Sequence, residues 1–547
     1  MTTAVARHTP TRAGSGSLTG TGTLVRFMLR RDRFRLPAWV AGMGLFVVYV
    51  GVALPEVAPT EEALATTVPI FNQPVGRMFT GPGLGLDAPT YERFFAAGYV
   101  LYLFLVAALM SIMLVARHTR AEEQSGRAEL VRANVVGRHA GLTATLVVSL
   151  VANVAAAVVV AGLALANGFA TTGSLLVGAA TGLVGMTFAG VTAVTAQLSE
   201  YSRSAAGLAG AVLGVAFVLR ALGDMVRVGG SALSWVSPLG WAGQTGPYVL
   251  DRWWPLLLLV GLLALTVALA FWLQSRRDLG AGLLAARPGR AEARPWLGTP
   301  LGLAARLQRS SGLAWGVAIV ALGIVDGLFT QALVDSAADL PDLLREMFGG
   351  ETMRDGYLTF LAVLVGYVTS AYVVFAVQTL RTEEARGRAE AVLATPTSRT
   401  AWAGSHLAVV AAWAVLIMVA AGLLTGLAAA AVTGDGALVG ATLLAHLNLI
   451  PAVLVVVGLC ALLFGWAPVL LAPVAWALVG VMVLVGNFGT LLDLPRWLVD
   501  LSPLSHPAQV PVEDLDVAPL VVLLVLAAVG VALGILGLGR RQVLGRS

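Results

Sequence analysis

The sequence predicts an all-α polytopic membrane protein with about twelve transmembrane helices, arranged as two parallel repeats of six. Three observations predict this fold class. Of 547 residues, 58% are hydrophobic and 12% are charged, whereas soluble domains carry about 25% charged residues. Apolar stretches near the ~20 residues that a helix needs to cross the hydrocarbon core recur along the chain. A charged ten-residue segment also occurs twice, once in each half.

Each long apolar stretch is interpreted as a helix, because a helix satisfies its own backbone hydrogen bonds where no water is available. The first six predicted spans cover residues 36–54, 94–116, 140–166, 175–198, 205–222 and 255–273. The second six cover residues 313–334, 357–380, 407–432, 438–464, 467–485 and 520–538.

The arginines predict the orientation of these spans. All 35 basic residues are arginines, and with twelve spans their clusters fall on one side of the membrane. The positive-inside rule makes that side cytoplasmic, so both termini are expected in the cytoplasm. The basic pI of about 9.7 then needs no nucleic-acid partner.

Two loops indicate an internal duplication. RAEEQSGRAE at residues 120–129 and RTEEARGRAE at residues 381–390 agree at seven of ten positions and follow the second and eighth spans. We call residues 120–139 the first Glu-Glu loop and residues 381–399 the second. Ser237-Pro238-Leu239 and Ser502-Pro503-Leu504 repeat at nearly the same separation, as do the Arg-Arg pairs at 276–277 and 540–541. Repeats of six spans are parallel, because the chain starts each from the same side.

The duplication gives the expected domain organisation. It comprises a flexible cytosolic N-terminus over residues 1–20, a first six-helix repeat over 21–275, a cytosolic linker over 276–300 and a second repeat over 301–547. Ahead of the first span, Leu24, Phe27 and Met28 share one helical face, which predicts a helix lying in the inner headgroup layer. Residues 303–309 repeat this pattern more faintly, and an ordinary basic flank explains both stretches equally well.

Missing residue types exclude several chemistries. A Walker A loop needs a lysine to reach the nucleotide phosphates, and the chain has no lysine. The chain is therefore expected to be no enzyme and unable to hydrolyse ATP by itself. Schiff-base catalysis is excluded for the same reason. The six histidines show no metal-ligand spacing, so no metal site is predicted.

Few ionisable groups lie inside the predicted spans, and Asp326 and Arg220 are the clearest. A proton-driven exporter usually places several such groups at mid-membrane, so their scarcity disfavours that mechanism. Asp326 fits the outer interface equally well. The Gly178/Gly182 and Gly210/Gly214 spacings predict close helix packing.

Bulky side chains in spans two and eight are candidates for the lining of a cavity for apolar ligands. They are Tyr99, Tyr102, Phe104, Met110, Met113, Tyr367, Tyr372 and Phe375.

The repeated acids and arginines of the Glu-Glu loops predict a docking element. A solvated loop does not need the same charges at the same spacing twice, whereas a short helix that seats in a soluble partner does. Two copies imply two partner sites. The candidate residues are Glu122, Glu123, Gly126, Arg127 and Glu129 in the first loop, and Glu383, Glu384, Gly387, Arg388 and Glu390 in the second.

The second loop, EARGRAEAVLATPTSR at residues 384–399, resembles the cytosolic signature of type-two ABC exporter permeases. The double length resembles permeases linked to the export of polyketide antibiotics and drugs in high-GC bacteria. The resemblance covers essentially the full chain, although only the loop signature is specific. In that family the segment is a coupling helix that contacts the ATP-binding subunit, which implies that role for the ten loop residues.

The resemblance implies the remaining parts of the system. Two ATP-binding cassette ATPase subunits would bind ATP and Mg, with no cofactor bound by this chain. The protein would sit among the lipids of a bacterial plasma membrane and export a hydrophobic or amphipathic small molecule. Segments around Trp235, Trp241 and Trp497 look like the family's outward re-entrant region, although plain extracellular loops also fit. The first loop departs from the signature, with Val135 where the second has Pro396, so the resemblance does not imply equal engagement of both ATPases.

Two rival functions stay open. A proton-coupled secondary drug transporter also has parallel six-helix repeats. A membrane-embedded lipid-modifying enzyme would need a polar catalytic cluster, and Glu513, Asp514 and Asp516 supply carboxylates without histidine or metal companions. Drug efflux that persists without an ATPase distinguishes the first rival from the ABC exporter.

Overall fold

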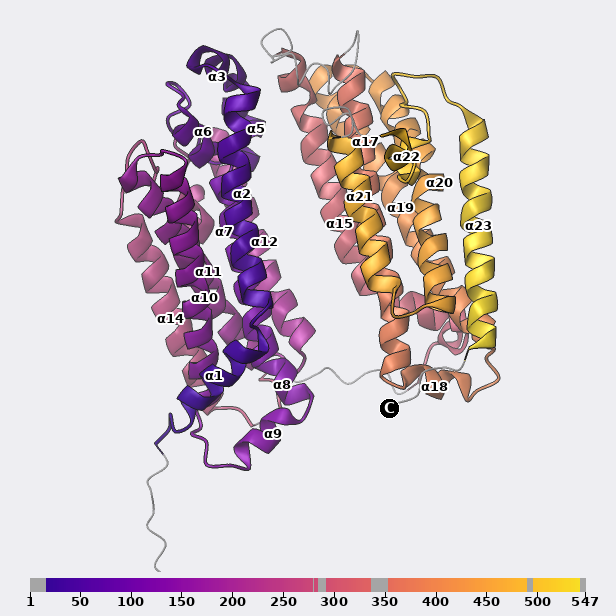
Figure 1. Ribbon diagram of the computed structural model, residues 1–547, viewed down its shortest axis with the longest axis horizontal. Helices are drawn as coiled ribbons and strands as arrows, with labels where there is room; N and C mark the ends of the chain where they lie inside the picture. The colour runs from indigo at the N-terminus through magenta and orange to yellow at the C-terminus, as the bar shows by residue number, and fades with distance from the viewer. Residues whose placement is uncertain (1–15, 279, 284–291, 336–352, 489–494, 542–547) are drawn as a thin grey trace, which may run out of the picture. The chain divides into compact units, whose positions relative to one another are not determined.

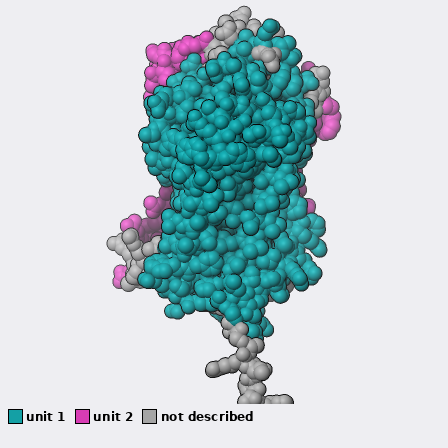
Figure 2. Space-filling model, turned by 90° about the vertical axis from the view of Figure 1, so that its left-hand side faces the viewer, with its two compact units in different colours: residues 1–288 teal, residues 289–547 magenta. Residues whose placement is uncertain are grey.

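The computed structural model describes residues 16–278, 280–283, 292–335, 353–488 and 495–541. The chain forms two compact units, Met1–Pro288 and Gly289–Ser547, which Figure 2 colours separately. The boundary falls inside the predicted linker of residues 276–300. The described residues form helices and turns, without a β-strand among them. Most of the predicted N-terminal tail, residues 1–15, lies outside the described residues.

Unit 1 is a bundle of six long helices with short helices at its two ends. The long helices are α2 (Arg35–Val57), α7 (Val100–His118), α10 (Ala140–Ala166), α11 (Thr171–Leu198), α12 (Ser202–Val226) and α14 (Pro255–Ser275). The short ones are α1 (Thr21–Arg31), α3 (Glu61–Thr67), α4 (Pro69–Asn72), α5 (Pro74–Thr80), α6 (Tyr91–Gly98), α8 (Arg120–Gln124), α9 (Arg127–Arg132), η1 (Ser234–Val236) and α13 (Pro238–Gly243). Helices α1, α8 and α9 lie at one end of the unit, and α3 lies at the other (Figure 1).

Unit 2 is built in the same way. Its long helices are α15 (Pro300–Asp335), α17 (Met353–Ala385), α19 (Arg399–Thr433), α20 (Ala437–Trp466), α21 (Leu471–Phe488) and α23 (Val517–Arg540). The short helices are η2 (Pro295–Gly298), α18 (Arg388–Leu393), α22 (Arg496–Val499) and η4 (Pro503–Ser505). Helix α18 lies at the end of the unit where α23 finishes, and α22 lies towards the opposite end (Figure 1). In each unit we call the end that carries the Glu-Glu loop the loop end.

Eleven of the described helices are long and apolar enough to cross a membrane, six in unit 1 and five in unit 2. Helix α21, which matches the eleventh predicted span, is apolar over the shorter stretch Leu471–Gly486. The chain is therefore an all-α polytopic membrane protein, and each of the twelve predicted spans has a helical counterpart.

Helix α11 occupies the centre of unit 1, where it packs against α7, α10 and α14. Glycines bring it close to α10, because a Cβ on Gly178 would lie 2.4 Å from the Ala157 carbonyl oxygen and one on Gly182 would lie 2.9 Å from that of Asn153. This confirms the packing prediction for the first glycine pair. A Cβ added to Gly210 or Gly214 of α12 would meet no atom within 4 Å among the described residues, so the second predicted contact is not made inside unit 1.

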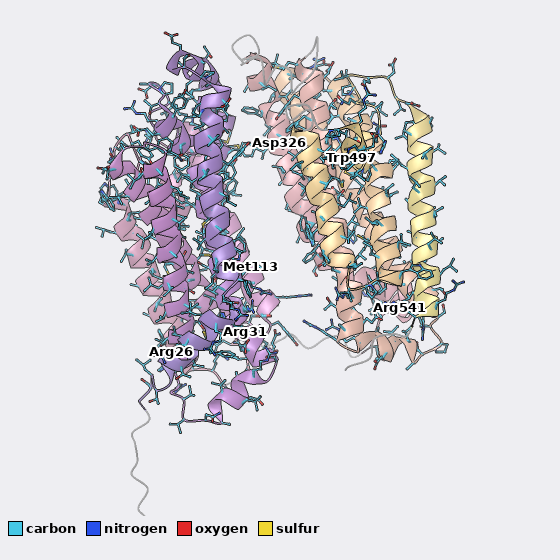
Figure 3. All side chains as sticks on the ribbon, in the orientation of Figure 1. Arg26, Arg31, Met113, Asp326, Trp497 and Arg541 are labelled. Carbon is cyan, nitrogen blue, oxygen red and sulfur yellow. The ribbon has the colours of Figure 1, made fainter. Side chains whose placement is uncertain are left out.

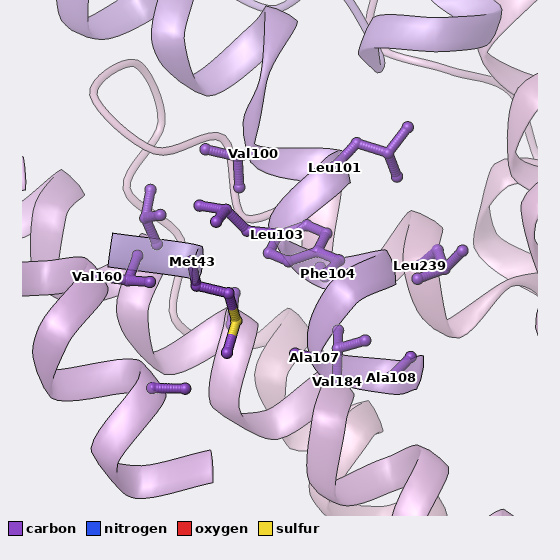
Figure 4. Close-up of a cluster of buried hydrophobic side chains, with 14 of the residues drawn as sticks. Met43, Val100, Leu101, Leu103, Phe104, Ala107, Ala108, Val160, Val184 and Leu239 are labelled. Atoms are coloured by element: carbon purple, nitrogen blue, oxygen red, sulfur yellow. The ribbon is translucent and has the colours of Figure 1, made fainter. Parts of the chain in front are cut away.

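The core of unit 1 forms where its helices meet. Met43 of α2, Phe104 of α7, Val160 of α10 and Val184 of α11 are all buried in one cluster (Figure 4). Between membrane helices, close van der Waals packing of such side chains replaces the hydrophobic effect as the main attraction.

The second predicted span, residues 94–116, is wrong as a single helix. The structure divides it at Tyr99, whose φ of −127° and ψ of −25° lie outside helical values, so that α6 ends at Gly98 and α7 begins at Val100. Glycine is a poor helix former, and the Tyr99 ring turns to pack edge-on against Phe94 at 5.8 Å between ring centroids.

The two predicted headgroup helices also differ from each other. In unit 1, α1 is separate from α2, whereas in unit 2 the equivalent residues continue into the single 36-residue helix α15. Pro37 lacks the N–H that would donate to the Arg33 carbonyl. An Ala-Trp pair follows Pro37 at residues 38–39 and follows Leu313 at residues 314–315, so Leu313 is the counterpart of Pro37 in the second unit. Leucine donates this bond, so the second helix runs on without a break.

Candidate functional site

Both Glu-Glu loops turn sharply at a glycine. Gly126 separates α8 from α9 with a φ of +72°, and Gly387 separates the end of α17 from α18 with a φ of +69°. A residue with a Cβ is strained in this left-handed region, so the glycine predicted in each loop has a backbone role. The turn sets α9 and α18 at the loop end of their units.

The second glutamate of each loop forms a buried two-bond ion pair with an arginine just after the last long helix. In unit 1, Arg277 donates to Glu123 through Nη2–Oε1 at 2.6 Å and Nη1–Oε2 at 3.0 Å. In unit 2, Arg541 donates to Glu384 through Nη1–Oε1 at 2.5 Å and Nη2–Oε2 at 2.7 Å. The partners are 154 and 157 residues apart in sequence. We call these pairs the unit 1 clamp and the unit 2 clamp.

The clamps are largely removed from solvent. The exposed fractions of the side chains are 11% for Glu123 and 6% for Arg277, and 1% for Glu384 and 16% for Arg541. Arg120, whose side chain is buried, adds a third charge to the unit 1 clamp through a 2.8 Å bond to Glu123. Figure 3 shows Arg541 at the loop end of unit 2.

The clamps place two predicted docking carboxylates inside their own units. Because Glu123 and Glu384 are bonded to arginines of the same unit, their oxygens tie each loop to the segment after α14 or α23. In the sequence, Arg277 and Arg541 stand out only as markers of the duplication. The signal that could have found their role is the same Arg-Arg pair after the last helix of each half.

The first glutamates have different partners in the two loops. Glu122 pairs with Arg31 of α1 and lies 3.9 Å from Arg127. Glu383 instead pairs with Arg388 of its own loop, through a 2.8 Å bond from Nε to Oε2. The first loop is therefore bonded to α1, whereas the second closes on itself.

In each unit a polar residue near the start of the first long helix contacts the helix of the second span, but the side chains involved differ between the units. Asp32 after α1 contacts His118 at 2.5 Å and Arg117 at 3.0 Å. At the corresponding place in unit 2, Gln308 donates to Thr379 Oγ1 at 2.9 Å. The contact is charged in unit 1 and neutral in unit 2.

The outward surfaces of the two loops also differ. In the first loop Arg127 and Glu129 are exposed, and so are the apolar side chains of Leu130 (72%) and Val135 (73%). Leu130 and Val135 lie on α9 and just after it, outside every helix that could span a membrane.

In the second loop the exposed charged residues are Arg386, Arg388, Glu390 and Arg399. Val392 and Leu393 pack against the core of unit 2. The first loop thus presents an apolar surface bordered by charges, which is typical of a protein interface. The second presents a mainly polar one.

A cleft of about 120 Å³ lies behind the first loop. It is enclosed by Phe27 and Arg31 of α1, by Val131 of α9, and by Arg138 and Gln274 at the ends of α10 and α14. Figure 3 shows Arg26 and Arg31 at this end of unit 1.

The eight predicted lining residues do not share one cavity within either unit. Phe104, Met110, Tyr367 and Tyr372 are core residues. Met113 and Phe375 are exposed on the surfaces of their units, Met113 towards the loop end of α7 (Figure 3). Of the buried members, Phe104 lines a small pocket beside Arg220, whereas Met110, Tyr367 and Tyr372 pack in the cores of their units.

Tyr102 does line an open groove between α2 and α7, of about 550 Å³. Trp39, Met43 and Phe46 form its other bulky walls, and Arg35 lies at its margin. The rings of Phe46 and Tyr99 are 6.3 Å apart, so Tyr99 supports this groove from behind.

The segments between the fifth and sixth spans fold into short packed helices. Ser237 caps α13 by accepting from the Leu239 and Gly240 amides, and Trp241 Nε1 donates to the Trp235 carbonyl at 2.6 Å. Burial raises the pKa of the nearby Tyr248 hydroxyl, which lies 3.1 Å from Ser174 Oγ. In unit 2, Asp326 and Trp497 both lie towards the end opposite the loop (Figure 3), and Asp326 lies about midway between the centre of α15 and its last residue, Asp335.

Comparison with known proteins identifies a family with a similar sequence over most of the chain. A family model described as multidrug efflux system permease Rv1217c, C-terminal domain, matches residues 22–273 and 297–538. The chain is 38% identical over 545 residues to the multidrug efflux system permease protein Rv1217c of Mycobacterium tuberculosis, with 98% of each chain covered. The matched segments contain both Glu-Glu loops.

Proposed function

Because the chain belongs to the family of the multidrug efflux system permease Rv1217c, we propose that it is the membrane subunit of a drug exporter of the type-two ABC class. Two separate ATPase subunits supply the energy, and the cargo is a hydrophobic or amphipathic compound leaving a bacterial cell. The name of the relative supports the efflux of drugs, and the Glu-Glu loops support the coupling to ATPases.

The observation that carries this proposal is the pair of clamped loops. Each loop exposes a charged surface at the loop end of its unit, and each is bonded through its second glutamate to the segment after the last long helix. A partner that moved either loop would therefore also move the end of α14 or α23. In this assignment Arg127, Glu129, Arg388 and Glu390 face the ATPases, whereas Glu123 and Glu384 transmit the movement.

In this proposal ATP is hydrolysed by another chain, because this one has no lysine for a Walker A loop. ATP and Mg bind to the partner subunits. Closure of an ATPase dimer around nucleotide favours one arrangement of the loops over the other, and that difference in affinity biases the membrane helices. The loops and both termini then face the cytoplasm of a bacterial plasma membrane, where ATP is found.

An apolar or amphipathic cargo fits the membrane-facing surfaces. The groove of Tyr102 has aromatic and methionine walls and one arginine at its margin, which suits a bulky apolar molecule with a polar end. Membrane lipids cover the remaining apolar surface of the helices.

Reconstitution tests the proposal. The full chain is purified from its own membranes, co-purifying proteins are identified, and the complex is placed in proteoliposomes with a lipophilic fluorescent drug. We expect a Walker-containing subunit to co-purify and drug export to require hydrolysable ATP. Export that continues without the partner and stops when a protonophore collapses the proton gradient would instead identify a proton-coupled secondary transporter.

A further inference from the structure

Unit 1 contains a buried cluster of charges at the end opposite the Glu-Glu loop. Arg220 and Asp224, one helical turn apart on α12, are each 1% exposed, and Arg77 of α5 is 6% exposed. Arg220 Nη1 lies 3.4 Å from Asp224 Oδ2, and Ser234 donates to Asp224 Oδ1 at 2.6 Å. The proposed function makes no use of this cluster.

The cluster carries more positive than negative charge. Arg77 donates to the backbone carbonyls of Asp224 at 2.9 Å and Met225 at 2.8 Å. Arg220 donates to the carbonyls of Arg77 and Met78. Among the described residues, Asp224 is the one carboxylate bonded to either guanidinium group. Two cations therefore share one anion in a buried place, where an uncompensated charge is costly.

One donor of the cluster remains unused. The Nε–H group of Arg220 is buried and has no acceptor among the described residues. A buried charged donor of this kind would normally be paired with an acceptor.

A small pocket adjoins Arg220. Its volume is about 40 Å³, enough for a carboxylate group or roughly three water molecules, at 10–15 Å³ per water by this measure. Arg220 is its charged lining residue, and its walls include Leu101 and Phe104 of α7 and Leu239 of α13. The site therefore combines one buried cation with apolar walls.

We propose that this pocket binds the carboxylate of an amphipathic acid, with Arg220 holding the acid group and the apolar tail leaving along the walls of α7 and α13. The ligand's negative charge offsets the excess positive charge of the cluster. The inference rests on the proposed function for its biological meaning, since it makes acidic amphiphiles one class of cargo. Binding itself needs neither ATPase nor transport.

Three twelve-carbon probes test the pocket: dodecanoate, dodecanol and dodecyltrimethylammonium. They have the same tail and differ in charge. Binding of each to the full chain is measured by equilibrium dialysis in nanodiscs of zwitterionic lipid. We expect dodecanoate to bind at least about tenfold more tightly than the other two, as a charge-assisted hydrogen bond in a buried site predicts.

Two variants with opposite expected effects separate binding from misfolding. Arg220→Met should abolish the preference for dodecanoate. Asp224→Asn keeps an acceptor for Ser234 but removes the competing anion, so it should tighten dodecanoate binding. Filling the pocket with Ala96→Leu, which leaves all three charges in place, should weaken it.

Equal affinity for the three probes, or unchanged or weaker dodecanoate binding to Asp224→Asn, would overturn the proposal. These outcomes are independent of the ATPase. If dodecanoate binds as expected while ATP drives no export, the pocket stands and the proposed function fails.

Discussion

The ion pair between Glu384 and Arg541 in the unit 2 clamp gives a quantitative prediction for the free energy of unfolding. Glu384→Gln removes the negative partner of Arg541 and keeps nearly the same side-chain volume. Because Glu384 is 1% exposed and Arg541 is 16% exposed, this change leaves a mostly buried guanidinium without its counter-charge. Breaking a buried pair in this way costs about 3 kcal/mol, and partial solvation of Arg541 keeps the cost at the lower end of the known range.

A neighbouring pair in the same loop provides the matched control. Glu383 also bonds to an arginine with two contacts, but its partner Arg388 is 49% exposed. Solvent screens such a pair, so Glu383→Gln should cost less than about 1 kcal/mol. The same chemical change at adjacent residues is thus expected to differ severalfold in its effect on unfolding.

The assay is the free energy of reversible unfolding of the purified full chain in mixed micelles. It is measured for both single variants, for Arg541→Met, and for the double variant Glu384→Gln with Arg541→Met. The double variant should lose about 1–3 kcal/mol less than the sum of its single changes, because the two single changes both remove the same ion pair. Equal costs for Glu383→Gln and Glu384→Gln, or additive effects in the double variant, would refute the clamp.

The remaining predictions concern the loops and the glycines. Glu123→Gln should destabilise unit 1 at least as much as Glu384→Gln does unit 2, because both Arg120 and Arg277 lose their shared carboxylate; an effect under about 1 kcal/mol in the same unfolding assay would contradict this. Leu130→Glu should weaken association with the proposed ATPase about tenfold and leave the free energy of unfolding unchanged, since Leu130 is exposed and lies on the apolar surface of the first loop. Ala391→Glu, at the equivalent position of the more polar second loop, should have a smaller effect in the same co-purification titration. Gly126→Ala should lower the free energy of unfolding by about 1–2 kcal/mol, because the φ of Gly126 is +72°. Gly210→Ala, with open space around the added Cβ, should leave the free energy of unfolding unchanged or raise it slightly in the same assay.

Glu123 and Glu384 are held in ion pairs inside their units, and this affects which residues should be mutated to test docking. A charge reversal at Glu123 or Glu384 would disturb the unit itself, and lost association would then say little about docking. Glu129 and Glu390 are the better probes, because both are exposed. Reversing them should alter association without altering stability.

Composition and periodicity determine much of this protein before any folding is considered. A chain that is 58% hydrophobic has to hide its backbone in helices where there is no water. The third predicted span, residues 140–166, coincides with α10 for the same local reason. The repeat of the Glu-Glu loops and the need for glycine at their turns are likewise visible in the printed sequence.

The tertiary packing determines which side chains of those elements are buried and which residues they contact. Whether Glu123 meets solvent or Arg277 depends on how α14 ends beside the loop, 154 residues later in the chain. The direction of a side chain around a helix that is apolar on all sides has no local signature, so Phe104 and Met113 look alike in sequence although one is buried and the other exposed. Side-chain contacts between distant helices arise from the packing of whole helices, and a residue's neighbours in the chain do not contain that information.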